Sequence, residues 1–119
     1  MATAVGHALV GFVLFRQPIT AIVAAGFVNA IQPPFYAAEP NFDRIATFWF
    51  LLFSPVLLLL GQITNRAVNN ADAHTLELVG RYLMVIGALG SVVLPVSGNW
   101  VLIALGVVVL RAAAGVRDL

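Results

Sequence analysis

The chain has 119 residues, of which 61% are hydrophobic and 9% are charged, and its mean hydropathy is +1.01. A soluble domain carries about 25% charged residues, so this composition excludes an ordinary water-soluble fold and predicts one all-α membrane domain, residues 1–119. The net charge of +1 is too small for nucleic-acid binding, and the lack of cysteine excludes disulfides, thiol catalysis and iron–sulfur clusters.

The first predicted membrane span covers residues 2–15 and is apolar throughout. It is short for a hydrocarbon core of about 30 Å at about 1.5 Å per residue. It lacks the basic beginning of a signal peptide, and Arg16-Gln17-Pro18 is a poor cleavage site. We therefore expect a membrane helix that either thins the bilayer locally or belongs to a chain that starts upstream of Met1.

Residues 18–32 predict a short re-entrant or interfacial helix. Pro18 suits the first turn of a helix, and Pro33-Pro34 ends the segment. The segment is too short for a full crossing. Asn29 points either into the bundle or into ordinary loop hydrogen bonds. In the loop that follows, Arg44 is expected to form a surface ion pair with a neighbouring acid.

Three further spans are predicted at 45–63, 77–95 and 99–114. The first of them, IATFWFLLFSPVLLLLGQI, has no charge and is long enough to cross a bilayer. A polar connection, residues 64–74, separates it from the next span, which Asp72 or Thr75 is expected to cap. Small residues predict close helix packing along the 77–95 span; they are Gly80, Gly87, Gly90 and Ser91.

Four crossings place both termini and the 64–74 connection on one side of the membrane. That side holds more arginines than the other; its members are Arg66, Arg81, Arg111 and Arg117, against Arg16 and Arg44. The positive-inside bias therefore predicts that both termini are cytoplasmic, in the inner membrane of a bacterial cell.

His7 is the one ionisable side chain that the sequence places deep in a predicted span. It precedes Arg16 by nine residues, so a straight helix puts it about 13 Å deeper. Polar groups at such depth are expensive and often functional. His7 is therefore the candidate catalytic acid–base group or cofactor ligand, with haem an unfavoured choice and no metal site predicted. The alternative is a neutral imidazole that hydrogen-bonds to a neighbouring helix.

A substrate pocket beside His7 is a second hypothesis. Trp49 lies about 7 Å inward from Arg44 and, with Phe48 and Asn29, is a candidate lining residue. The alternative for the aromatic residues is bulky packing or the interfacial aromatic belt.

Several motifs resemble a known family. They are Gly6-His7 followed by Gly11-Phe12, then Gly26-Phe27-Val28-Asn29, then Phe48-Trp49-Phe50 before a leucine run, and Pro95-Val-Ser-Gly98 before a final apolar helix. Together they are similar to a family of small four-helix bacterial membrane proteins of unknown function, common in actinobacteria. The resemblance covers nearly the whole chain and implies a four-transmembrane-helix bundle. It implies no activity.

Two functional hypotheses follow. The favoured one is a non-catalytic membrane protein that self-associates as a homo-oligomer or serves as an accessory subunit of a larger complex. The other is a small membrane enzyme or ligand binder, such as an isomerase, that acts on a lipophilic substrate through His7. A small transporter is less favoured, because no carboxylate lies in the middle of a predicted span to exchange protons.

Overall fold

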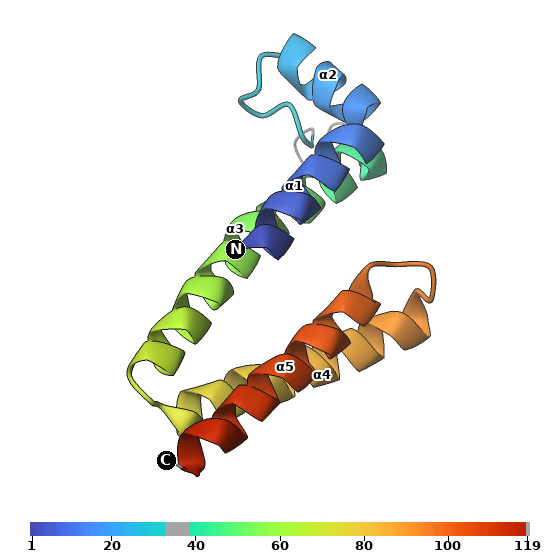
Figure 1. Ribbon diagram of the computed structural model, residues 1–119. Helices are drawn as coiled ribbons and strands as arrows, with labels where there is room; N and C mark the ends of the chain where they lie inside the picture. The colour runs from blue at the N-terminus through green and yellow to red at the C-terminus, as the bar shows by residue number, and fades with distance from the viewer. Residues whose placement is uncertain (33–38, 119) are drawn as a thin grey trace. The chain divides into compact units, whose positions relative to one another are not determined.

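A computed structural model describes residues 1–32 and 39–118. Within these residues the chain forms helices and no strand, which confirms the all-α class (Figure 1). The helices are α1 (Ala2–Leu14), α2 (Arg16–Ala24), α3 (Phe42–Asn69), α4 (Ala73–Val93) and α5 (Asn99–Arg117). The chain divides into two compact units, Met1–Leu59 and Leu60–Leu119, so that the division falls within α3.

Three helices, α3, α4 and α5, are each long and apolar enough to cross a membrane. The pair formed by α1 and α2 passes the same test only when taken together, and it is bent by 77°. The described chain therefore contains three candidate spans, or four if the bent pair counts as one, and the predicted membrane character is supported.

The bend between α1 and α2 follows from Pro18. This residue lies in the first turn of α2, as expected from the sequence. In a straight continuation of α1 its ring would clash with the carbonyl group of Leu14, and it has no N–H to donate to that group. The helix therefore stops at Leu14, turns at Phe15, whose φ is −103°, and restarts at Arg16.

The short helix ends much earlier than the predicted residue 32. Gly26 has φ +87°, and its N–H donates to the carbonyl of Val23, while the N–H of Phe27 donates to the carbonyl of Ile22. These two bonds form a Schellman motif, in which a glycine in the left-handed conformation terminates a helix. The predicted stop at residues 33 and 34 lies outside the described residues.

In the first unit, α1 packs closely against the amino-terminal half of α3 (Figure 1). Gly11 makes this approach feasible, because a Cβ added there would lie 2.7 Å from Leu51 Cδ2 and 3.0 Å from the ring of Phe50. The helix α3 continues through Pro55. Pro55 leaves the carbonyl of Leu51 without its usual intrahelical donor, a loss that membrane helices tolerate.

The connection predicted at residues 64–74 is mostly helical. α3 runs to Asn69, and α4 begins at Ala73. Ala71 takes the left-handed position of a second Schellman motif, with φ +52° and with the N–H of Asp72 bonded to the carbonyl of Ala67. Asp72 then caps α4 by accepting a hydrogen bond from the N–H of Thr75 at 3.0 Å, which confirms the expected cap.

In the second unit, α4 and α5 form a tightly packed hairpin (Figure 1). A Cβ added at Gly106 would lie 2.9 Å from the carbonyl oxygen of Gly80, and one added at Gly87 would lie 2.7 Å from the side chain of Ile103. These distances confirm the close packing expected of the small residues. Trp100 stabilises the turn between the helices, since its Nε1–H donates to the carbonyl of Pro95 at 2.9 Å.

Candidate functional site

His7 lies on the face of α1 that meets α3. Its Nδ1 is 2.9 Å from Ser54 Oγ, and the imidazole stacks on Phe50 with ring centroids 4.1 Å apart and planes 12° apart. Phe53 meets the same imidazole edge-on at 5.7 Å. One helix therefore supplies a hydrogen-bond partner and two aromatic walls for a single side chain of the other.

The hydrogen bond to Ser54 restricts the chemistry of the imidazole. If Nδ1 carries the proton, Nδ1–H donates to Ser54 and Nε2 is an acceptor; in the other tautomer the serine hydroxyl donates to Nδ1. Among the described residues no hydrogen bond involves Nε2, and the His7 side chain is half-buried. The arrangement resembles the way in which a second residue fixes the orientation of a ligating or proton-transferring histidine.

The other candidate residues lie apart from this cluster. Phe48 and Trp49 contact each other edge-on at 5.5 Å, and the Trp49 side chain is 63% exposed on α3. Asn29 is exposed in the turn after α2 with φ +56°, so it is not on a helix face as the sequence interpretation assumed. The described contacts of His7 are thus with Phe50, Phe53 and Ser54.

Arg44 also differs from its expected role. Its Nη1 donates to the carbonyl of Ala30 at 2.7 Å, whereas the surface ion pair with a neighbouring acid does not form among the described residues. Ala30 is buried, so the guanidinium holds the end of the turn that follows α2 against the start of α3. This contact anchors the end of a segment in which three residues within four positions have positive φ; these are Gly26, Phe27 and Asn29.

A family model described as "Family of unknown function (DUF6463)" matches residues 1–115. The chain belongs to this family. The expected resemblance to an uncharacterised family is therefore confirmed. No curated protein and no solved structure matches the chain.

This DUF6463 member contains a second polar contact that sequence reasoning missed. Arg117, in the last turn of α5, approaches Glu77 of α4, with Nη2 and Oε2 2.6 Å apart. Arg81 approaches the same carboxylate oxygen at 3.8 Å. Sequence reasoning used Arg81 and Arg117 only in the positive-inside bias and predicted no acidic partner for either.

The sequence contains a pattern from which the polar partner of His7 could have been predicted. Phe50, Phe53 and Ser54 follow i, i+3, i+4 spacing and so share one face of α3. A histidine in a predicted span needs a polar partner on a neighbouring helix, and Ser54 is the polar residue at the middle of the 45–63 stretch. Among the described residues, no group of three or more His, Cys, Asp or Glu side chains is arranged to hold a metal ion.

Proposed function

We propose that this protein is a non-catalytic membrane subunit that associates in the bilayer with further copies of itself or with another membrane protein. The proposal rests on one observation: polar side chains of α1 and α3 form hydrogen bonds to other atoms of the protein. His7 bonds to Ser54 across two helices. Thr47 and Thr64 bond to carbonyls one turn earlier, at 2.6 Å and 2.8 Å. The first bond joins two helices and the other two satisfy hydroxyls within α3, so these groups leave little polarity directed at a substrate.

The outer face of α1 supports association. Val5, Leu9 and Val13 are all more than half exposed there. Gly6 lies on this side, and a Cβ added to it would meet no atom within 4 Å. An open glycine among large apolar residues forms a notch that lets a second helix approach closely, and such packing drives helix association in lipid.

Native mass spectrometry of the gently solubilised protein tests this proposal. We expect a mass equal to a whole number of chains, or to the chain plus a second protein. Gly6→Leu fills the notch and should shift a homo-oligomer toward monomer. Gly115→Leu is the matched control, because a Cβ at Gly115 also meets no atom within 4 Å but lies at the other end of the chain. A monomer with no protein partner would reject the proposal.

One observation favours a second function, the binding or isomerisation of a lipophilic molecule at His7. The Nε2 atom has no hydrogen-bond partner among the described residues, so it is available to a ligand. A stoichiometric small molecule that co-purifies with the protein and disappears in His7→Phe would support this function. Haem would then be identified directly by its absorption spectrum. Retention of the same molecule by His7→Phe would exclude a direct role for the imidazole.

We also propose that the protein lies in the inner membrane of a bacterial cell with both termini in the cytoplasm. Support comes from the arginine distribution described above. The chain has no native cysteine, so single-cysteine variants can be labelled without background. We expect an impermeant maleimide added outside to label Val96→Cys, whereas Ala2→Cys and Asn70→Cys react only after permeabilisation. Labelling of Ala2→Cys from outside would instead make α1 and α2 a re-entrant pair.

A further inference from the structure

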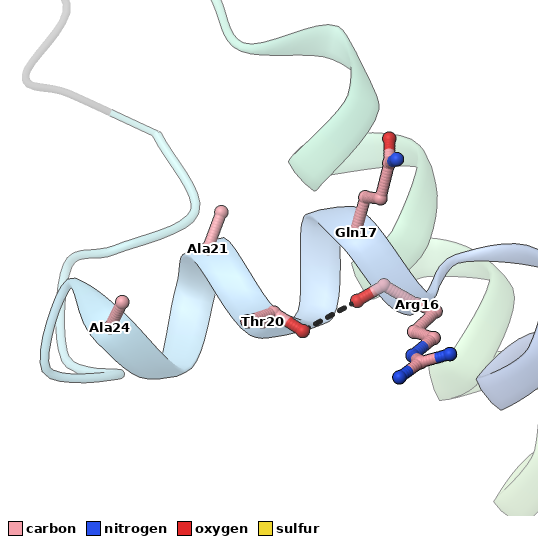
Figure 2. A pocket seen from close by; sticks show the side chains of 5 residues that line it. All are labelled: Arg16, Gln17, Thr20, Ala21 and Ala24. Carbon is pink, nitrogen blue, oxygen red and sulfur yellow. Dashed lines mark hydrogen bonds between the residues drawn. The ribbon is translucent and has the colours of Figure 1, made fainter.

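The helix α2 carries an open, mostly apolar pocket with Arg16 at its edge, and the proposed function does not use it. The pocket has a volume of about 470 Å³, and all of its lining residues belong to α2 (Figure 2). They are Arg16, Gln17, Thr20, Ala21 and Ala24. Arg16, Thr20 and Ala24 form one row at intervals of four residues, and Gln17 and Ala21 form the adjacent row. The polar side chains stand at one end, and the two alanines leave room beyond them.

The charge of Arg16 has no counter-ion nearby. Arg16 is the one charged residue in the first 38 positions, because the first acid in the chain is Glu39. Among residues 1–32 and 39–118 the ion pairs involve Glu77 instead. The guanidinium is exposed, and its planar fork of N–H donors fits a phosphate bidentately.

The neighbouring polar groups complete the chemistry of a headgroup site. Thr20 Oγ1–H donates to the carbonyl of Arg16 at 2.9 Å, as the dashed line in Figure 2 shows. The hydroxyl proton is thus engaged, and the lone pairs of Oγ1 remain free to accept a bond from a ligand hydroxyl. The carboxamide of Gln17 both donates and accepts. Arg16 and Thr20 lie on the same side of α2 in Figure 2 and offer a fork for a phosphate and an acceptor for a hydroxyl group, whereas Gln17 points the other way.

The position of the pocket identifies the kind of ligand. The 77° bend turns α2 away from the axis of α1, so that if α1 enters the bilayer, α2 runs nearly along its surface. Val23, at the end of α2, and Phe27, in the turn that follows, are 61% and 71% exposed and suit contact with acyl chains. A phosphate at this depth belongs to a lipid.

We propose that the Arg16 pocket binds the headgroup of an anionic phospholipid such as phosphatidylglycerol. The guanidinium of Arg16 holds the phosphodiester, and Thr20 Oγ1 accepts a hydrogen bond from a glycerol hydroxyl. A choline or ethanolamine headgroup fits less well, because its cationic nitrogen would lie beside the Arg16 guanidinium.

Native mass spectrometry of the full chain in detergent, titrated with phosphatidylglycerol or with phosphatidylcholine, tests the proposal. We expect Arg16→Gln to weaken phosphatidylglycerol binding about tenfold, as the loss of a charge-assisted hydrogen-bonded contact implies. Phosphatidylcholine binding should barely change. Arg111→Gln removes the same charge from an exposed position on α5 and should weaken binding by less than about twofold. Equal losses in the two variants would overturn the proposal, since they would show attraction by net charge alone.

A charge-preserving variant tests the pocket itself. Ala24→Leu fills the space beside Thr20 without altering Arg16, and we expect it to weaken phosphatidylglycerol binding about threefold or more. Unchanged binding in Ala24→Leu would overturn the pocket, whatever Arg16→Gln does. Displacement of the lipid by millimolar inorganic phosphate would overturn the assignment to a lipid and indicate a free-anion site.

Circular dichroism of each variant shows whether its α-helix content is retained. If Arg16→Gln misfolds, Arg16→Lys replaces it, since lysine keeps the charge but lacks the planar fork of N–H donors.

Discussion

Gly80 and Gly106 lie against each other across the α4–α5 hairpin, and a Cβ added to either would approach the carbonyl oxygen of the other, at 3.2 Å and 2.9 Å. A Cβ at Gly106 would lie 2.9 Å from the Gly80 carbonyl oxygen and 3.0 Å from the Met84 backbone nitrogen. The Met84 Cγ atom, at 2.8 Å, belongs to a flexible side chain, but these two are backbone atoms, which cannot move aside in the same way. The hairpin therefore depends on the absence of two Cβ atoms.

We expect Gly106→Ala to lower the free energy of unfolding of the protein by about 1–3 kcal/mol, because the added methyl forces the helices apart. Gly115→Ala is the control in the same helix. Its Cβ meets open space, and alanine is the better helix former, so it should be neutral or stabilising by up to about 1 kcal/mol. Unfolding in mixed micelles with increasing dodecyl sulfate measures both. A destabilisation of Gly115→Ala equal to that of Gly106→Ala would contradict the close-packing account.

Ala71 occupies the left-handed position after α3, where glycine is the usual residue. Ala71→Gly removes the steric cost of φ +52° and should raise the free energy of unfolding by about 0.5–1 kcal/mol. Ala114→Gly, in the interior of α5, should lower it by about 1 kcal/mol. The same unfolding assay gives both values, and a loss of stability in Ala71→Gly would show that this turn does not adopt the left-handed conformation.

The contact between His7 and Ser54 should appear as a coupling energy. A double-mutant cycle with His7→Phe and Ser54→Ala keeps an aromatic ring stacked on Phe50 while it removes the hydrogen bond. We expect a coupling of about 0.5–1.5 kcal/mol in unfolding free energy. Strictly additive effects of the two substitutions would mean that the bond contributes nothing to the packing of α1 on α3.

The cap of α4 should make stability depend on acid pH. The hydroxyl of Thr75, and then its backbone N–H, hold the pKa of Asp72 below its ordinary value. A lowered pKa means that the charged carboxylate stabilises the folded state above the ordinary pKa of about 3.9, and that this stabilisation is lost as the pH falls through the folded-state value. Asp72→Ala should lower the thermal midpoint at pH 7.

The same substitution should matter little in acid. Below the folded-state pKa the aspartic acid is protonated in the parent chain also, so the midpoints of the two proteins should converge. Asp118→Ala, which changes the residue directly after α5, serves as a control that alters the net charge equally. A pH-independent difference between Asp72→Ala and the parent chain would contradict the role of the charged cap.

The three long spans were predictable because hydropathy alone marks them, and the Asp72 cap was predictable because a capping residue precedes an apolar run. The end of the short helix could also have been predicted, since glycine, here Gly26, is the usual residue in a Schellman motif. The end of α3 was not, because alanine stands at position 71, where only backbone geometry reveals the left-handed turn.

The aromatic residues that contact His7 could not be predicted from the sequence, for a different reason. The sequence gives the depth of a residue along its helix, but the face of the neighbouring helix that it meets depends on how the two helices rotate and slide in packing. Gly11 fixes that rotation here, since it allows Phe50 and Leu51 to approach. The aromatic partners of His7 are therefore Phe50 and Phe53, whereas Phe48 and Trp49 pair with each other.

The ion pair between Glu77 and Arg117 has a consequence for biogenesis. Glu77 lies near the start of α4 and its side chain is only 22% exposed, while Arg117 lies in the last turn of α5. During translation Arg81 follows four residues later but approaches the carboxylate only at 3.8 Å, so its close partner Arg117 arrives after nearly the entire hairpin has been made. An unpaired carboxylate enters lipid at a high cost. We therefore expect the translocon to release α4 and α5 as a pair, so that a chain truncated before Arg117 is inserted less efficiently than one that retains Arg117.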